Sequence, residues 1–249
     1  MAAGIIEVTG MVLTGSSVKE YDKRIEILTK ERGRIAAFAT GARRAGSTLS
    51  ACTVPFTYGT YWLCEGRNSY YVRSADINIY FHQIAEDFDI LCYASYFAEL
   101  TRYYTRENVE APQELLLLYV TCSALVKGQV SLPLMRSIFE MRMMQLEGEA
   151  LELFHCLQCG EEKKELKVFF KRGGLLCREC AQSLSGYRWE QGCTLSPDAL
   201  YALQFILTAP LQKLYTFRLS EEIERELSHF MKKYFAQYLH HDFKSLQFL

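Results

Sequence analysis

The N-terminal fold is decided by residues 24–41, which read RIEILTKERGRIAAFATG. The run Arg24–Lys30 begins with alternating charged and apolar residues, and a second run rich in apolar residues, Arg34–Gly41, follows the turn Glu31-Arg32-Gly33. Short runs of this kind, separated by a glycine-containing turn, are typical of β-strands. The stretch therefore predicts two strands joined by a tight turn.

Similar runs flank this pair on both sides, at Ile5–Thr14, Thr57–Glu65 and Ser69–Ser74. Five short strands within about 75 residues fit a small β-barrel, and the OB-fold is one such barrel. We therefore expect residues 1–80 to form an OB-fold domain.

After Ile84 the apolar spacing changes to that of helices, with residues recurring at intervals of three and four. Ser196-Pro197-Asp198 and Ser220-Glu221-Glu222 are typical helix starts, because serine caps a helix well and proline suits its first turn. The sequence thus predicts an α+β protein in which residues 81–249 form a mostly α-helical domain. The stripes that support this are Ile90, Tyr93, Phe97, Leu100 and Tyr104; Leu115, Leu118, Cys122 and Leu125; Met135, Phe139, Met143 and Leu146; and Ile223, Leu227, Phe230, Tyr234 and Tyr238.

Composition is that of an ordinary globular protein, with 49% hydrophobic and 23% charged residues among 249. The longest apolar run, Leu115–Val126, is interrupted by Thr121 and Ser123. A bilayer span needs roughly 20 apolar residues, which is more than this run offers, so we expect no membrane segment. The N-terminus lacks the pattern of a secretory signal, and we expect a cytoplasmic protein.

Four of the nine cysteines form two pairs, Cys156-Leu-Gln-Cys159 and Cys177-Arg-Glu-Cys180, in a C-x2-C-x17-C-x2-C arrangement. This spacing is typical of tetrahedral zinc sites, and the segment between the pairs suggests a β-hairpin. Residues 155–181 are therefore expected to form a module resembling a zinc ribbon, holding one structural Zn²⁺ per chain. Four thiolates leave no open position on the metal, which argues against catalysis. Four free core cysteines are the alternative, and His155 and Cys193 are candidate substitute ligands.

The net charge of −1 predicts no strong nucleic-acid affinity for the chain as a whole. Within the predicted barrel, however, basic residues outnumber acidic ones. Basic residues are interleaved with apolar ones between Lys19 and Arg44, which would attract a phosphate backbone if they shared one face of the barrel. An ordinary solvated surface is the alternative, because Glu20, Asp22 and Glu26 lie among them. Aromatic residues that could stack on bases, or fill the barrel, are Tyr21, Phe38, Tyr58, Tyr61, Trp62, Tyr70 and Tyr71.

The order of residues adds a family resemblance. KEYDKRIEILTKERGR (19–34), followed by GARR (41–44) and PFT (55–57), resembles the N-terminal signature of the RecO family. CLQCG (156–160), GGLLCREC (173–180) and LSP (195–197) resemble the same family in the same order, so that the similarity spans roughly residues 4 to 207.

The resemblance implies a recombination mediator of the RecF pathway without enzymatic activity. RecO proteins bind single- and double-stranded DNA, anneal complementary strands, and act with RecR to help RecA replace single-strand-binding protein. Their basic DNA-contact segment corresponds here to Lys23, Arg24, Lys30, Arg32, Arg34, Arg43 and Arg44. The family's contact with single-strand-binding protein lies in the helical part, and DNA binding implies association with the nucleoid. This chain departs from the family at Thr40, where a lysine is frequent.

No enzyme motif competes with this interpretation. Gly41–Thr48 superficially resembles a P-loop, but Ser47 stands where the phosphate-binding lysine is needed. The five histidines are scattered along the chain. We therefore expect no catalytic residues.

Overall fold

The computed structural model describes residues 4–67, 69–162 and 165–249. Backbone contacts divide the chain into two compact units. The first runs to Gln129 and also includes Phe243–Leu249, and the second comprises Val130–Asp242.

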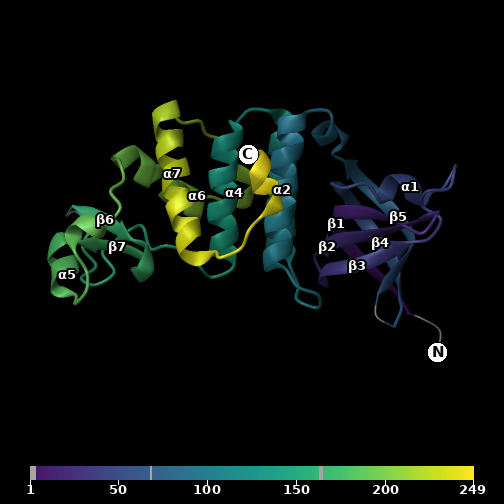
Figure 1. The fold of residues 1–249 in the computed structure, drawn as a ribbon, viewed down its shortest axis with the longest axis horizontal. Helices are drawn as coiled ribbons and strands as arrows, with labels where there is room; N and C mark the ends of the chain where they lie inside the picture. Colours follow the sequence, from purple (N-terminus) through teal and green to yellow (C-terminus); the bar gives the residue numbers. More distant parts are fainter. Residues whose placement is uncertain (1–3, 68, 163–164) are drawn as a thin grey trace. The chain divides into compact units, whose positions relative to one another are not determined.

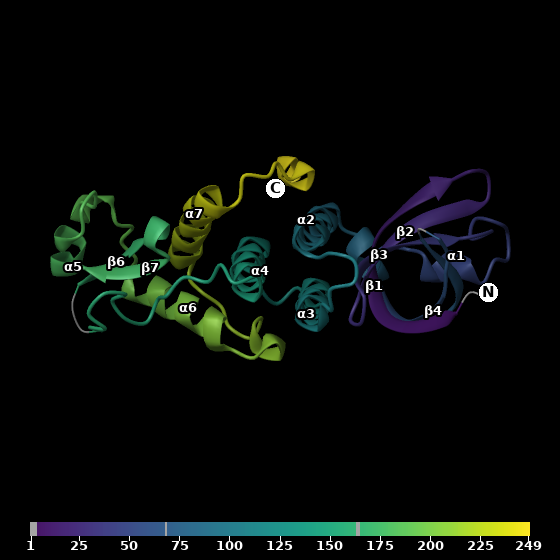
Figure 2. The same ribbon diagram turned by 90° about the horizontal axis from the view of Figure 1, so that it is seen from below.

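Five strands form a closed barrel in the first unit, in the order β1-β2-β3-β5-β4 (Figures 1 and 2). All neighbouring strands are antiparallel except β3 and β5, which are parallel. This is the topology of an OB-fold, as the sequence predicted. The strands are β1 (Ile5–Val18), β2 (Asp22–Thr29), β3 (Gly33–Ala39), β4 (Thr57–Glu65) and β5 (Tyr70–Tyr80), with the short helix α1 (Leu49–Cys52) between β3 and β4.

The barrel closes because β1 is long enough to pair with two partners. Its first half pairs with β4 and its second half with β2, and the register shifts between Val12 and Thr14, where the strand bends. Alternate residues along each strand point inward and fill the interior with aliphatic and aromatic side chains. Its buried core includes Val8, Val12, Ile25, Ile27, Ile35, Ala37, Tyr61 and Leu63.

Sequence periodicity located every strand of the barrel but placed some ends wrongly. The strand predicted at Ser69–Ser74 continues to Tyr80, because β5 stays paired with β4 until Tyr80 faces Thr57. Similarly, β1 extends to Val18 through its pairing with Asp22. The predicted domain boundary after residue 80 coincides with the end of β5 and stays a prediction.

The first unit also contains two helices, α2 (Phe88–Tyr104) and α3 (Pro112–Lys127), which pack against each other and follow the short 3-10 turn η1 (His82–Ala85). Asp87 caps α2 by accepting a hydrogen bond from the Ile90 N–H at 3.0 Å. The loop between the two helices contacts the β2–β3 turn, where the Asn108 N–H donates to the Arg32 carbonyl at 2.9 Å. The C-terminal turn η5 (Lys244–Phe248) returns to α2, since Glu99 accepts hydrogen bonds from the backbone of Lys244 and Ser245.

Three helices form the centre of the second unit: α4 (Leu132–Leu146), α6 (Pro197–Thr208) and α7 (Glu221–Tyr238). Ser196 and Ser220 cap α6 and α7 as the sequence predicted, each accepting a backbone N–H three residues ahead. The short turn η4 (Leu211–Lys213) connects the two helices. None of the helices in the described residues combines the length and apolar character that crossing a bilayer requires.

The cysteine module extends from this helical centre (Figure 1). It contains β6 (Leu166–Phe169), the turn η2 (Phe170–Arg172), β7 (Gly174–Cys177), α5 (Arg178–Ser183) and η3 (Trp189–Gln191). Backbone hydrogen bonds add Glu152 beside β7 and Cys193 beside β6, which widens the hairpin. The predicted hairpin between the cysteine pairs is therefore present.

Candidate functional site

The structure brings the two cysteine pairs together. The Sγ atoms of the four cysteines all lie within 4.8 Å of one another, and those of Cys159 and Cys177 are 3.9 Å apart. Four sulfurs at about 2.3 Å from one tetrahedral ion would be about 3.8 Å apart. The group, Cys156, Cys159, Cys177 and Cys180, can therefore hold one metal ion.

Local backbone geometry presents each pair to the same point. Gly160 closes the first turn by donating its N–H to the Cys156 carbonyl at 2.9 Å, with a φ of +72° that favours glycine. The second pair lies where β7 ends and α5 begins, so that Cys180 follows Cys177 by about one helical turn. The Cys177 N–H lies 3.4 Å from the Sγ of Cys156 and links the two turns.

Backbone N–H groups also set the charge of the Cys156 sulfur. Burial raises the pKa of this thiol, but hydrogen bonds from the backbone of Cys159, Cys177 and Gln158 outweigh it and lower the pKa to about 6. Thiolates are the form that binds metal. Cys156 thus favours its charged form, whereas the hydrogen bond with Cys177 and burial raise the pKa of Cys180.

A small apolar core supports the cysteines. Phe169, Leu176, Ala181 and Trp189 are buried beside Cys156 and Cys177. Two cations lie over the indole ring of Trp189, with Lys167 Nζ 4.7 Å and the Arg178 guanidinium 5.5 Å from the ring centroid.

The module is attached to α7 through Phe170. Its ring packs against that of Phe230, with 5.2 Å between the ring centroids, and the Tyr238 hydroxyl donates to the Phe170 carbonyl at 2.7 Å.

The candidate substitute ligands, His155 and Cys193, lie outside the four-sulfur group. The His155 ring faces Glu152 at 3.5 Å, and Cys193 pairs with Val168 along the edge of β6.

The seven basic residues predicted to bind DNA fall into three places on the barrel. Lys23, Arg43 and Arg44 lie at one end of the β2–β3 hairpin, around Tyr21. The Arg43 guanidinium donates to the Glu20 carbonyl at 3.0 Å, and Arg44 covers the exposed Tyr21 ring at 5.2 Å. Thr40, the departure from the family pattern, is exposed beside them.

Lys30 and Arg32 lie in the turn at the other end of the hairpin. The length of strand between Lys23 and Lys30 corresponds to about 23 Å. Arg32 also faces Glu65 at 3.8 Å. The ends of the hairpin are therefore separate patches.

Arg24 and Arg34 occupy the outer surface between these ends, where both face Glu26. Arg102 of α2 reaches the same carboxylate. Sequence reasoning missed Glu26 and Arg102 as partners, because residues so far apart along the chain leave no local pattern. Whether any of the seven residues contacts DNA stays a prediction.

The aromatic candidates separate clearly by burial. Tyr61 and Tyr70 are buried in the barrel, and Tyr58 packs against Tyr119. Tyr21 and Tyr71 are exposed. The rings of Tyr71 and Phe38 are in contact, with 5.9 Å between their centroids. These two side chains form an aromatic surface on the outside of β3 and β5.

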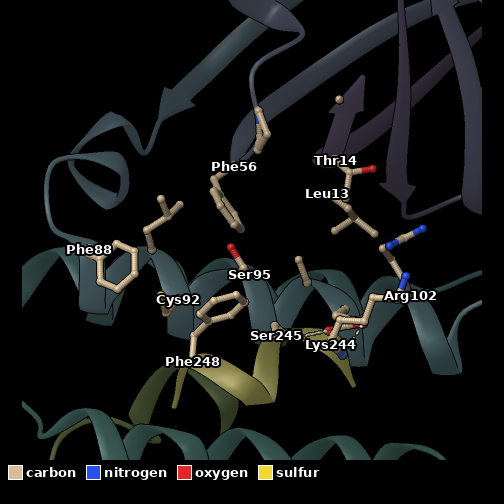
Figure 3. A pocket seen from close by; sticks show the side chains of 15 residues that line it. Leu13, Thr14, Phe56, Phe88, Cys92, Ser95, Arg102, Lys244, Ser245 and Phe248 are labelled. Carbon is tan, nitrogen blue, oxygen red and sulfur yellow. Dashed lines mark hydrogen bonds between the residues drawn. The ribbon is translucent and has the colours of Figure 1, made fainter. Parts of the chain in front are cut away.

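A pocket of about 540 Å³ is a further feature of the first unit (Figure 3). Its walls come from β1, the segment before β4, α2 and η5. They are mostly apolar at the end that holds Phe88, Cys92 and Phe248, whereas Arg102 and Lys244 lie toward the other end. The pocket suits an apolar group, with cations at one side.

Comparison with known proteins gives matches over nearly the whole chain. Residues 1–81 match the family described as "Recombination protein O N terminal", and residues 85–247 match "Recombination protein O C terminal". A protein of Acetivibrio thermocellus named DNA repair protein RecO is 29% identical over 98% of this chain and 96% of its own length. Proteins of the same name from Clostridium acetobutylicum and Clostridium perfringens are 26% and 29% identical, over 92% and 90% of this chain and 90% and 88% of their own lengths.

Proposed function

The chain belongs to the RecO family, and from this we propose that it acts as a mediator in DNA repair and recombination. In this proposal it binds single- and double-stranded DNA, anneals complementary strands and helps load RecA. The observation that carries the proposal is the exposed basic surface of the OB-fold, where Arg43 and Arg44 project from the loop after β3. OB-folds bind oligonucleotides on the face of strands 2 and 3 and on the β1–β2 and β4–β5 loops. Arg43 lies beside the β1–β2 loop, because its N–H donates to the Tyr21 carbonyl at 2.9 Å.

Annealing by such a protein needs binding but no bond chemistry. Arginine and lysine contacts neutralise phosphates without reading bases, so that strands of any sequence are held. Two strands held close together then pair by their own base complementarity. We therefore propose that the protein is not an enzyme and has no catalytic residue.

We propose that the ion held by the four cysteines is one structural Zn²⁺ per chain. An all-cysteine tetrahedral shell is typical of structural zinc, and it leaves no position for water or substrate. Its role is then to hold the hairpin and α5 together, since the apolar core around Trp189 is small.

The proposed partners follow from the family. They are RecR, single-strand-binding protein and, through them, RecA, all acting on DNA associated with the nucleoid in the cytoplasm. Binding of purified RecR and single-strand-binding protein to the chain can be measured directly by sedimentation velocity. Absence of a complex with both would contradict this part of the proposal.

Fluorescence anisotropy with a labelled single-stranded oligonucleotide tests the DNA-binding surface. Changing Arg43 and Arg44 to glutamate should weaken binding by about ten-fold or more and reduce the log–log salt slope by about 1.4, because two phosphate contacts are lost. The matched control changes Lys232 and Lys233, an adjacent exposed pair on α7, to glutamate. Equal losses in both variants, or binding without salt dependence, would refute the assignment of the surface.

An annealing assay tests the activity itself. Pairing of complementary strands coated with single-strand-binding protein should be faster with the protein than without it. The Arg43→Glu/Arg44→Glu variant should lose most of this acceleration. A wild-type protein that binds DNA but leaves the rate unchanged would overturn the annealing proposal.

A further inference from the structure

Glu26 is a buried carboxylate on the outside of the barrel, surrounded by three arginines. Its side chain is 8% exposed. Arg102 donates from Nε to Oε2 at 2.6 Å, Arg34 Nη1 lies 3.5 Å from the same oxygen, and Arg24 Nη1 donates to Oε1 at 3.3 Å. The three arginines come from β2, β3 and α2, so that one carboxylate connects three elements.

The cluster has more positive charge than Glu26 neutralises. Three guanidinium cations against one carboxylate leave a local formal charge of +2. The side chains of Arg24, Arg34 and Arg102 are 42%, 32% and 37% exposed. Within the described residues, Nη2 of Arg24, Nη2 of Arg34 and both terminal nitrogens of Arg102 make no hydrogen bond.

Each arginine is also held in a defined orientation. Arg34 Nε donates to the Thr105 carbonyl at 3.2 Å, in addition to its contact with Glu26. Arg102 extends from α2 toward the barrel strands (Figure 3). A long side chain that is ordered before binding loses less conformational entropy when a ligand arrives. The open nitrogens therefore form a preorganised set of donors for an anion.

An aromatic surface lies directly beside this cluster. In the strand register Arg24 faces Phe38, and Phe38 faces Tyr71 of β5, so that the three lie in one row across the sheet. Phe38 and Tyr71 are in contact, and Tyr71 is 44% exposed. A cationic cluster next to an exposed tyrosine and a partly exposed phenylalanine is the combination that binds single-stranded nucleic acid, whose bases are free to stack.

We propose that Arg24, Arg34 and Arg102, oriented by Glu26, bind a backbone phosphate of single-stranded DNA whose adjacent base stacks on Phe38 and Tyr71. This inference rests on the proposed DNA-binding function and deepens it. It adds Arg102, a residue of the helical part, to the binding surface, and makes Glu26 a positioning residue. Duplex DNA gains only the phosphate contact, because its bases are already stacked and paired.

The first test replaces Arg102 with glutamine and measures anisotropy with single-stranded and duplex oligonucleotides. Single-strand affinity should fall about five-fold. The salt slope should fall by at most about 0.7, the value for one whole phosphate contact, because Arg24 and Arg34 still face that phosphate. Arg102→Lys keeps the charge and should stay within two-fold of wild type. The control is Arg225→Gln, at an exposed arginine of α7, which should leave binding unchanged.

Glu26→Gln separates positioning from simple charge. The substitution raises the net charge by one, so a surface acting by charge alone would bind DNA more tightly. If Glu26 orients the arginines, binding should instead weaken, by about three-fold, with no decrease in salt slope. Tighter binding by Glu26→Gln would overturn the positioning role.

Two patterns of results distinguish this inference from the function on which it rests. In the first pattern, wild-type protein binds DNA, Arg43→Glu/Arg44→Glu weakens that binding, and both Arg102 variants bind as wild type. This pattern refutes the arginine site, and the proposed function stands. If the wild type shows no salt-sensitive binding, both fail. A loss in Tyr71→Ala that is equal for single-stranded and duplex DNA would refute the preference for single strands, because the phosphate contact of Arg102 is available to both kinds of DNA.

Discussion

Replacing Gly33 with alanine should destabilise the first unit far more than a glycine-to-alanine change usually does. Gly33 ends the β2–β3 turn with a φ of +61°, a conformation that costs other residues about 1–2 kcal/mol. A Cβ there would lie 2.1 Å from the Arg106 carbonyl oxygen and 2.3 Å from that of Val109. The loop between α2 and α3 would therefore have to move away from the barrel.

Moving this loop would lower the free energy of unfolding of the first unit. Overpacking of this kind typically costs about 1–3 kcal/mol, which with the backbone term gives a loss of about 2–5 kcal/mol. Three backbone hydrogen bonds between the hairpin and the loop would be strained, donated by Arg34 at 3.2 Å, Asn108 at 2.9 Å and Ala111 at 3.1 Å. A domain with a total stability of about 5–15 kcal/mol would be strongly affected.

Urea unfolding followed by circular dichroism measures the effect, with Gly46→Ala as the matched control. Gly46 has a φ of +74°, but nothing lies within 4 Å of the position that its Cβ would take. The control should lose only the backbone term of about 1–2 kcal/mol. If Gly33→Ala is destabilised no more than Gly46→Ala, the close packing of the α2–α3 loop on the hairpin is refuted.

Three further predictions concern the metal centre, the aromatic surface and acid stability. Chelation should abolish hydrogen-exchange protection within residues 155–181 while α4 and α6 keep theirs, because the helices have their own buried core; unchanged protection in the module would contradict a metal that supports its fold. Tyr71→Ala should weaken single-strand binding by about ten-fold, the equivalent of roughly 1–3 kcal/mol of stacking, and duplex binding much less; equal losses by anisotropy would exclude stacking. The free energy of unfolding should fall as the pH drops below about 4.5, and Glu26→Gln should remove part of that pH dependence. Urea titrations at several pH values measure it. An identical pH profile in the variant would show that Glu26 contributes nothing.

The direction of the pH effect follows from the pKa of Glu26. Burial raises this pKa, but the hydrogen bond and charge of Arg102, followed by Arg34 and Arg24, outweigh burial and hold it below its ordinary value of 4.5. A carboxyl whose pKa is lower in the folded state stabilises the fold above its unfolded pKa. That stability is lost as the pH falls through the folded pKa.

Local sequence by itself determined the elements of this protein and the grouping of its four paired cysteines. The alternation around Glu31-Arg32-Gly33 predicted the hairpin, the serines at 196 and 220 predicted helix starts, and the spacing of the two cysteine pairs predicted that their sulfurs would meet. These features depend on periodicity, capping and tight turns, which act between residues a few positions apart. Order along the chain also indicated the RecO family, which the comparisons confirmed.

Only the tertiary structure decided which charges and rings share a surface. Seven basic residues that are close in sequence divide among three places, because an antiparallel hairpin separates its two ends and its alternate side chains. Conversely, closure of the barrel places Tyr71 beside Phe38, and the packing of α2 places Arg102 on Glu26. Such pairings depend on strand register and helix docking between distant segments, for which a single sequence carries no local signal.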